Sequence, residues 1–149
     1  FILDVDHFKH YNDTNGHLAG DKLLQELAGL VNQSVRKDDI FGRFGGEEFL
    51  LVLPHTNATQ GMAAAEKIRT LLAQHPFPFA EKQPLGCISI SGGVAEYPFH
   101  GLDAAGLLHA SDEALYEAKR SGRNRVLPAK AVAPAPSVAP GGAEEPPRP

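Results

Sequence analysis

The sequence predicts an α+β fold built on an antiparallel or mixed β-sheet. Segments with strand-like and helix-like hydrophobic patterns alternate along the chain from residue 1 to residue 127. Within this alternation, two largely apolar runs at 40–44 and 48–53 are separated only by a short segment with two glycines, which is the pattern of a β-hairpin. A hairpin pairs antiparallel neighbours, so a doubly wound parallel sheet is not expected.

The first half of the chain is predicted to contain a strand, two helices and the hairpin. Residues 1–5 alternate between apolar and other side chains with the period of two that a half-buried strand shows. A short helix is expected at 7–13, with Asp6 as its N-cap, because a carboxylate accepts from the free amides of a first turn. A longer helix is predicted at about 21–35. Its apolar stripe consists of Leu23, Leu24, Leu27, Leu30 and Val31.

The second half is predicted to contain two helices and two strands. A helix at about 58–74 ends shortly before a proline, and a strand follows at 85–96. The last helix, at about 103–120, is stopped by a Ser-Gly pair, and a short strand at 124–127 closes the domain. The inward face of the last helix is expected to carry Leu107, Leu108, Ala114, Leu115 and Ala118.

The composition changes sharply after this strand. Residues 128–149 are rich in proline and alanine and carry no aromatic or periodic pattern. Such a segment buries too little apolar surface to offset its ordering entropy, so a disordered tail is expected. The folded domain is therefore predicted at 1–127. Because the chain begins without Met and inside a strand, we expect an N-terminally truncated fragment.

Composition also limits the classes of function. No apolar run is long enough to span a bilayer. The net charge of −4 argues against a nucleic-acid binder, since such proteins are usually basic. The single cysteine, Cys87, excludes a disulfide framework and fits a reducing compartment. A cytoplasmic location is expected for this part, with membrane anchoring of a full-length protein left open.

Acidic residues stand where buried strands would not normally place them. Asp4 lies among the apolar residues of the first strand, and Glu47 and Glu48 follow the glycines of the hairpin. Buried carboxylates are costly unless a cation pairs them, and Mg²⁺ prefers carboxylate and phosphate oxygens. Gly45 and Gly46 are interpreted as a tight turn with positive φ, whose backbone can approach a phosphate. The other interpretation is an exposed turn with ordinary surface glutamates.

Several short motifs form an ordered set. They are Asp-Val-Asp-His-Phe-Lys (4–9), Asn-Asp-Thr-Asn-Gly-His (12–17), Gly-Asp (20–21), Arg-Lys-Asp-Asp (36–39), Gly-Gly-Glu-Glu-Phe (45–49), Ser-Gly-Gly-Val-Ala (91–95) and Asp-Glu-Ala-Leu-Tyr-Glu-Ala-Lys-Arg-Ser-Gly-Arg-Asn (112–124). With these motifs in this order, the chain resembles the GGDEF family, the diguanylate cyclases, in the variant that reads Gly-Gly-Glu-Glu-Phe. The resemblance runs from Phe1 to about Leu127. It implies a palm-like, ferredoxin-related sheet of the nucleotidyl-cyclase type, mainly antiparallel and flanked by helices.

The resemblance implies a divalent metal site at the acidic residues. Glu47 is implied as the catalytic carboxylate and a metal ligand for Mg²⁺ or Mn²⁺. Asp4, Glu48 and the backbone carbonyl of Val5 would complete the site. Since adjacent residues of a strand point to opposite faces, Glu47 and Glu48 are expected to do different jobs. Lys9 is expected as a second catalytic residue, close to the triphosphate.

Cations and backbone amides are the expected partners of a GTP triphosphate. Gly45 and Gly46 would offer amides to its phosphates. Lys119 and Arg123 lie four residues apart across the end of the last helix, close enough to serve one anion, and they match the family pattern. Without the resemblance, the helix dipole alone explains cations at this end of a helix.

Two side chains are expected to read the guanine base. The carboxylate of Asp21 can accept from both N–H donors on the Watson–Crick edge of guanine, and the amide of Asn12 can both donate and accept. Contact with ribose or phosphate and a purely structural role both stay open for His17. The alternative interpretation of Asp21 is a first-turn acid favoured by the helix dipole, and that of Asn12 is a turn residue.

Arg36 and Asp39 form an Arg-x-x-Asp pair that ends six residues before Gly45. In the family this spacing marks an inhibitory site for the product cyclic di-GMP, where Arg grips guanine or phosphate and Asp accepts from the base. The resemblance therefore implies product feedback inhibition. Lys67 stands where some relatives carry an Arg that completes the inhibition, which leaves its strength open.

The activity that the resemblance implies is condensation of two GTP molecules into cyclic di-GMP and two pyrophosphates. Because the product is two-fold symmetric and the chain offers one metal cluster and one guanine reader, a homodimer is expected for catalysis. An upstream sensory module is expected outside this fragment. One alternative is a silent domain that serves as a GTP or cyclic di-GMP receptor, against which the retained metal and catalytic residues argue. Another is a mixed cyclic dinucleotide product, against which Asp21 argues.

Overall fold

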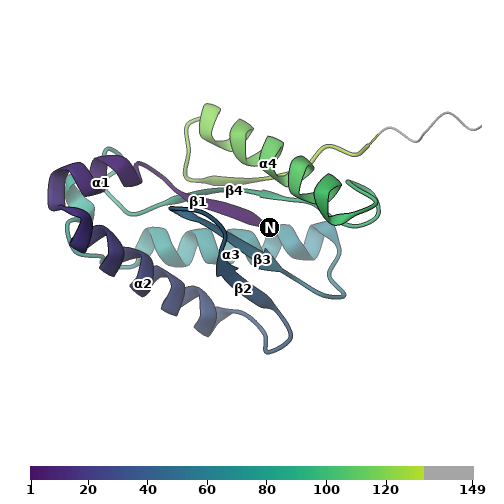
Figure 1. Cartoon of the computed structure of the whole chain (residues 1–149), viewed down its shortest axis with the longest axis horizontal. Helices are drawn as coiled ribbons and strands as arrows, with labels where there is room; N and C mark the ends of the chain where they lie inside the picture. The colour runs from purple at the N-terminus through teal and green to yellow at the C-terminus, as the bar shows by residue number, and fades with distance from the viewer. Residues whose placement is uncertain (133–149) are drawn as a thin grey trace, which may run out of the picture.

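The computed structural model describes residues 1–132, and these form a five-stranded sheet with helices packed against it (Figure 1). Among these residues, no helix is both long and apolar enough to cross a membrane. Most of the predicted tail falls on residues 133–149, outside the described residues. The strands are β1 (Ile2–Val5), β2 (Ile40–Arg43), β3 (Glu48–Val52), β4 (Ile90–Val94) and β5 (Arg125–Pro128). The helices are α1 (Phe8–Asn15), α2 (His17–Ser34), α3 (Ala58–Gln74), the 3₁₀ turn η1 (Ala80–Lys82) and α4 (Ala104–Arg120).

The sheet is mixed, with its strands in the order β2-β3-β1-β4-β5. The pairs β2–β3, β3–β1 and β1–β4 are antiparallel, whereas β4 and β5 run parallel. The parallel pair follows from α4, because a parallel connection needs a crossover and this helix supplies it. The predicted α+β fold with a mainly antiparallel sheet and flanking helices is confirmed.

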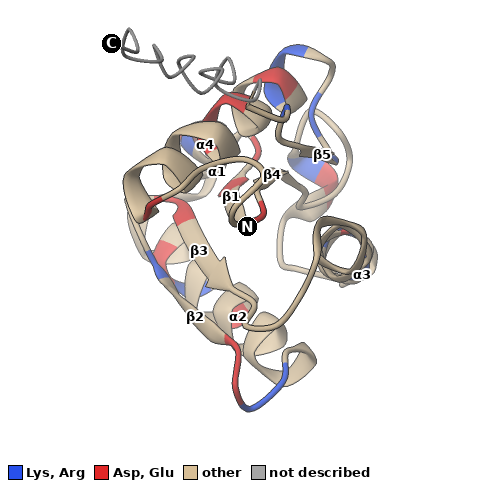
Figure 2. Cartoon of the chain, turned by 90° about the vertical axis from the view of Figure 1, so that its right-hand side faces the viewer, with Lys and Arg blue, Asp and Glu red and all other residues tan. Residues whose placement is uncertain are grey.

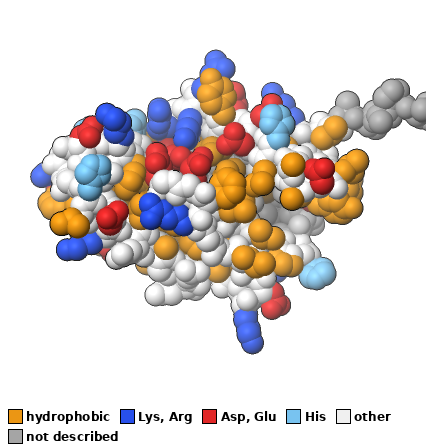
Figure 3. All heavy atoms as spheres, viewed as in Figure 1, with side chains coloured by type: hydrophobic (Ala, Val, Ile, Leu, Met, Phe, Trp, Pro, Cys, Tyr) orange, Lys and Arg blue, Asp and Glu red, His pale blue; other side chains and the backbone are white. Residues whose placement is uncertain are grey.

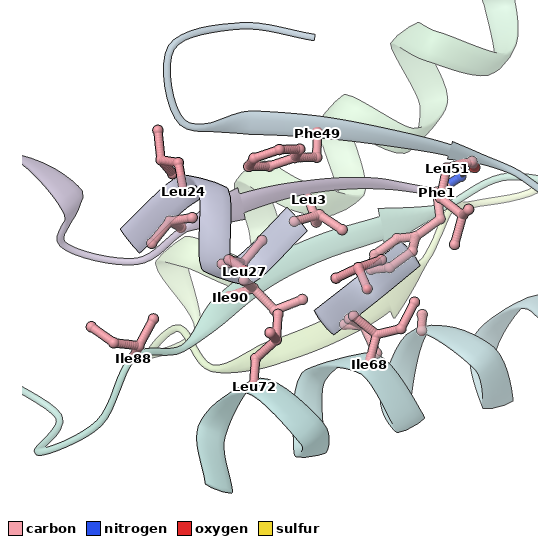
Figure 4. Close-up of a cluster of buried hydrophobic side chains, with 14 of the residues drawn as sticks. Phe1, Leu3, Leu24, Leu27, Phe49, Leu51, Ile68, Leu72, Ile88 and Ile90 are labelled. Atoms are coloured by element: carbon pink, nitrogen blue, oxygen red, sulfur yellow. Dashed lines mark hydrogen bonds between the residues drawn. The ribbon is translucent and has the colours of Figure 1, made fainter. Parts of the chain in front are cut away.

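The hydrophobic core lies between one face of the sheet and the helices α2 and α3. Leu3 of β1 lies directly opposite Phe49 of β3, and both side chains are buried. Side chains of the two helices point toward this pair in the close-up view (Figure 4). The helical residues labelled there are Leu24 and Leu27 of α2 and Ile68 and Leu72 of α3.

The helix α4 packs on the other face of the sheet (Figure 2). It comes so close to β4 that a Cβ atom at Gly93 would lie 1.9 Å from the backbone oxygen of Ser111 in α4. Successive residues of a strand point to opposite faces, so Asp4 leaves β1 on the α4 side while Leu3 and Val5 enter the core. The last turn of α4 thereby comes to the acidic end of the sheet.

The predicted start of the second helix is wrong. The helix α2 begins at His17 rather than at Asp21, and only Gly16, with φ of 90°, separates it from α1. Leu18 is 79% exposed, so the first turn carries no apolar stripe that periodicity could detect. Asp21 therefore lies in the second turn and is not the first-turn acid that the alternative interpretation required.

Two further details differ from the prediction. Asp6 is not the N-cap of α1: His7 holds that position with φ of 54°, and no side chain caps the helix. Asp6 is instead buried beneath the ends of two other strands, for reasons given below. The strand predicted at 85–96 shortens to β4, because a turn precedes it in which Gly86 has φ of 72°.

Candidate active site

The carboxylates of two distant motifs meet at one end of the sheet. Asp4 lies in β1 directly opposite Glu48 of β3, so both side chains leave the same face. The amide of Val5 donates to the carbonyl of Glu47 over 3.2 Å, which holds the hairpin loop against β1. Asp and Glu side chains gather on this face with Lys and Arg side chains beside them (Figure 3). Sheet pairing thus assembles the acidic cluster that the sequence predicted.

The electrostatics of the cluster centre on Asp4, which is only 6% exposed. The pKa of its carboxyl is raised to about 6, chiefly because burial penalises the charged form. The ammonium of Lys119, 3.2 Å away, opposes this shift, while the charges of Glu47 and Glu48 add to it. Within the described part of the chain, the ammonium of Lys119 pairs with Asp4 alone, so the charges of Glu47 and Glu48 remain unpaired by it and favour a further cation.

The donor set suits a hard divalent cation, although the side chains alone do not form a closed cage. Within residues 1–132, no three His, Cys, Asp or Glu side chains stand close enough together to hold a metal ion. Mg²⁺ is commonly bound by one or two carboxylates together with the phosphates of a substrate. The carboxylates around Asp4 fit that mode of binding, in which phosphate oxygens of the substrate would supply the remaining ligands.

The hairpin loop is longer than the predicted two-residue turn. The amides of Phe44 and Gly45 both donate to the carbonyl of Glu48, over 2.8 and 3.1 Å. Neither Gly45 nor Gly46 has positive φ, so the conformational reason offered for the glycines is wrong. Glu47 lies in this loop, before β3 begins, so the strand alternation that predicted opposite faces for the two glutamates does not apply to it.

The lack of a side chain at Gly45 leaves room for Glu48, and the carbonyls of both glycines accept hydrogen bonds from Arg43. A Cβ atom at Gly45 would lie 2.8 Å from Oε2 of Glu48, whereas one at Gly46 would meet nothing. The guanidinium of Arg43 donates to the carbonyl of Gly45 over 3.1 Å and to that of Gly46 over 2.6 Å. Since a trans peptide directs its N–H opposite to its C=O, the amides of Gly46 and Glu47 point away from Arg43. They are oriented as donors to an anion.

The structure brings one predicted cation to the carboxylates and places two others at a distance from them. Lys119, in the last turn of α4, is bonded to Asp4. Arg123 follows the helix end with φ of 64° and lies near His7, whose pKa is lowered by burial and then by the charge of Arg123. Lys9 lies on the surface of α1 with its side chain 91% exposed, and it pairs with Asp13 at 3.2 Å.

The corner between α1 and α2 holds the predicted base readers. Oδ1 of Asn12 is buried and has no donor among the described residues. It lies so close to α2 that a Cβ atom at Gly20 would be 1.8 Å from it. Asp21 is the next residue and is exposed, as is His17 at the start of the helix. A buried acceptor without a donor is costly, and the Asn12 amide would relieve that cost by turning toward a ligand that donates.

The predicted product-binding pair lies apart from the acidic cluster, in the loop between α2 and β2 that projects at the lower edge of Figure 2. Oδ2 of Asp39 accepts from the amide of Arg36 over 2.8 Å, and the amide of Asp39 donates to the carbonyl of Arg36 over 3.1 Å. This mutual pair closes a turn, and the side chain of Arg36 remains exposed.

The sequence patterns did not predict that Asp6 is a buried hydrogen-bond acceptor. Its side chain accepts from the hydroxyls of Ser89 and Ser91 and from the amide of Asn124. The signal that could have found it is the Ser-x-Ser alternation at 89–91, which places two hydroxyls on one face of an apolar strand. Hydroxyls buried in a sheet require a polar partner.

Comparison with known proteins identifies the family. The family model described as diguanylate cyclase, GGDEF domain, matches residues 1–125. The chain is 44% identical over 126 residues to diguanylate cyclase DgcP of Pseudomonas aeruginosa and 41% identical over 129 residues to diguanylate cyclase A of Treponema denticola. These matches cover 84% and 87% of this chain but only 18% and 34% of the two relatives. The chain thus spans about a third or less of the curated relatives it matches.

Solved structures agree with the sequence relatives. The active GGEEF domain of a diguanylate cyclase from Vibrio cholerae superposes with a TM-score of 0.77 at 37% identity, covering 88% of this chain and 81% of that one. The GGDEF domain of DgcB from Caulobacter crescentus, in complex with c-di-GMP, gives a TM-score of 0.75 at 34% identity, covering 85% and 74%. With the acidic cluster and the family model in agreement, the chain belongs to the GGDEF-domain family of diguanylate cyclases.

Proposed function

We propose that this chain is a catalytic domain that condenses two GTP molecules into cyclic di-GMP and two pyrophosphates. The observation that carries the proposal is the buried carboxylate of Asp4, held beside Lys119 and within the field of Glu47 and Glu48. A surplus of negative charge at the end of a sheet is costly unless it serves to bind a cation. Relatives named diguanylate cyclases support the same activity.

The metal-binding role falls to the acidic cluster. Asp4, Glu47, Glu48 and the backbone carbonyl of Val5 would hold Mg²⁺ or Mn²⁺. When bound, such an ion neutralises phosphate charge and activates the attacking 3′-hydroxyl. The pKa of Asp4 is raised chiefly by burial and, to a smaller extent, by the charges of Glu47 and Glu48, and a bound cation would favour its ionised form.

The triphosphate would lie between the hairpin loop and the end of α4. The amides of Gly46 and Glu47 point away from Arg43 and are free to donate to phosphate oxygens, while Gly45 keeps the loop close to Glu48. Lys119 and Arg123 supply positive charge from the other side. Lys9 would join them by leaving its exposed pair with Asp13, which costs little because exposed ion pairs contribute little.

The guanine base would enter the corner between α1 and α2. The orphaned Oδ1 of Asn12 would accept from the base, and the carboxylate of Asp21 would accept from neighbouring N–H groups. His17, at the start of α2, would contact the ribose or a phosphate, with a purely structural role as its alternative.

Assembly and regulation extend the proposal. One chain carries one base-reading corner and one acidic cluster, so two chains must face each other to join two GTP molecules. Product would bind in the loop at Arg36 and Asp39 and inhibit turnover. A sensory module elsewhere in the protein, with the domain itself in the cytoplasm, would control how the two chains meet.

The test is Glu47→Gln in the chain fused to a dimerising coiled coil, incubated with GTP and Mg²⁺. The amide is nearly isosteric but neutral, so cyclic di-GMP formation should fall by about 10² or more, while GTP binding stays measurable by calorimetry. Glu113→Gln, at an exposed position of α4, is the matched control and should remain active. Product formation within about tenfold of the parent in Glu47→Gln would refute the assignment. A parent that binds nucleotide yet makes no product would favour the receptor alternative.

A further inference from the structure

A buried carboxylate next to the acidic cluster is not accounted for by metal or nucleotide binding. Asp6 is 3% exposed and follows β1 directly. Its Oδ1 accepts from the hydroxyl of Ser91 over 2.7 Å, and its Oδ2 accepts from the hydroxyl of Ser89 over 2.7 Å and the amide of Asn124 over 2.9 Å. Three donors replace the solvent around this carboxylate, so hydrogen bonds compensate for its burial.

The donors come from two separate parts of the chain. Ser89 precedes β4, Ser91 lies within it, and Asn124 belongs to the turn that joins α4 to β5. The side chain of Asn124 is held by a third part of the chain, because Nη1 of Arg69 in α3 donates to its Oδ1 over 2.8 Å. Asp6 thus ties the end of β1 to the turn that follows α4, and α3 supports that turn from the outside.

This turn needs such support because its backbone is strained. Arg123 has φ of 64° and Asn124 has φ of 46°, so two consecutive residues with side chains adopt the left-handed conformation. Residues other than glycine adopt it at a cost and keep it only where the surroundings hold them. The bond from the amide of Asn124 to Asp6 holds this conformation in place.

The turn also sets the position of the predicted phosphate cations. Lys119 lies in the last turn of α4 and Arg123 in the turn itself, and the amide of Arg123 donates to the carbonyl of Ala118 over 3.1 Å. The conformation of this segment therefore decides where both positive charges stand relative to Asp4. A change of the backbone at Asn124 would move Arg123 and loosen the helix end that carries Lys119.

We propose that Asp6 is a positioning residue, which clamps the turn at Asn124 and thereby aims Lys119 and Arg123 at the triphosphate of GTP. The proposal rests on the function proposed above. It adds that binding of the triphosphate, and not of the guanine base, depends on a carboxylate that touches no nucleotide.

The test compares two ligands in one variant. Calorimetry in the presence of Mg²⁺ would use GMP and an unreactive GTP analogue with a methylene group between the α- and β-phosphates. In Asp6→Ala the analogue should bind about tenfold more weakly than in the parent, since charge-assisted contacts to phosphate are lost, while GMP affinity stays within about twofold. Asp103→Ala is the matched control, because it also removes a carboxylate bonded to a backbone amide, that of Gly106 at the opposite end of α4. It should leave both affinities unchanged.

A second pair of variants tests the turn without touching the buried carboxylate, and it decides the matter if Asp6→Ala does not fold. Asn124→Ala and Asn124→Gly both lose the bond from Arg69, but only glycine adopts positive φ easily. The analogue should bind several-fold more weakly to the alanine variant and nearly as in the parent to the glycine variant. Equal affinities of Asn124→Ala and Asn124→Gly for the analogue would overturn the proposal that the conformation of this turn positions the two cations.

The outcomes separate the two proposals. A parent chain that binds the analogue no more tightly than GMP refutes the proposed function and this inference with it. A parent that prefers the analogue, together with an Asp6→Ala variant that loses both ligands equally or neither, refutes the positioning role alone.

Discussion

At the scale of single residues, the buried oxygen of Asn12 shows how a missing side chain shapes the site. The absence of a side chain at Gly20 leaves room for the Asn12 amide, because a Cβ atom there would lie 1.8 Å from Oδ1 of Asn12. The oxygen is thus packed against the backbone of α2 and receives no donor from the described residues. The cost of burying it is recovered only when a ligand donates to it.

Gly20→Ala should therefore weaken binding of guanine nucleotides by about tenfold or more, because the added methyl displaces the Asn12 amide. Gly29→Ala, in the same helix with open space around its Cβ, is the matched control. It should bind GMP normally and gain about 0.5–1 kcal/mol of stability from the better helix propensity of alanine. Calorimetry with GMP and thermal denaturation of both variants measure the two effects. Unchanged GMP affinity in Gly20→Ala would remove Asn12 from the base-reading site.

At the scale of elements, the contact of α4 with β4 decides where the site lies. Gly93 of β4 touches the backbone of Ser111 in α4, and the same helix ends at Lys119 beside Asp4. The close approach of helix and strand therefore sets the distance between the cation and the acidic cluster. The loop after α2 is a second, separate element, closed by the mutual bonds of Arg36 and Asp39.

Gly93→Ala should destabilise the protein by about 3 kcal/mol or more, because backbone atoms of α4 cannot move aside as a flexible side chain could. Gly42→Ala in β2, where a Cβ atom meets nothing within 4 Å, should change the free energy of unfolding by less than about 1 kcal/mol. Urea denaturation of the two variants gives the comparison. Similar midpoints for both would mean that α4 tolerates displacement from the sheet.

Arg36→Ala should weaken cyclic di-GMP binding by roughly 1.5–3 kcal/mol, the range of hydrogen bonds to charged groups, with little change in the initial rate measured without product. The turn itself should persist, because its bonds to Asp39 use the backbone of residue 36 and not the guanidinium. Lys37→Ala, the neighbouring exposed cation, is the control and should bind product as the parent does. Equal product affinity in all three proteins would refute the inhibitory site.

At the scale of the whole molecule, one chain offers one corner between α1 and α2, proposed to read the base, and one acidic cluster at the end of β1 and β3. Because the proposed product joins two identical halves, the reacting groups have to come from two chains that face each other.

The specific activity of the unfused chain should therefore rise with its concentration, as expected when the active species is a dimer in equilibrium with monomer. Fusion to a dimerising coiled coil should make the specific activity independent of concentration. Rates of cyclic di-GMP formation over a hundredfold dilution series distinguish the two forms. A specific activity that is constant for the unfused chain at every concentration would contradict the requirement for two chains.

Much of the fold could be predicted because the signals are local. The period of two at 1–5, the stripe from Leu23 to Val31 and the paired runs around the glycines each depend on neighbours a few residues away. The order of the motifs likewise led to the family that the comparisons show. Local signals failed where no pattern existed, as at the first turn of α2, where an exposed Leu18 conceals the start of the helix.

The sequence by itself determined the succession of elements, the family and the residue types of the acidic cluster. The tertiary structure alone decided which of them meet. It bonded Lys119 to Asp4 while leaving Lys9 on the surface, and it packed Gly20 against Asn12. It also made Asp6 a buried acceptor for Asn124, 118 residues away, where local reasoning predicted a helix cap. The physical reason is that a carboxylate takes the nearest donors in space, and sheet pairing and helix packing bring those donors from distant parts of the chain.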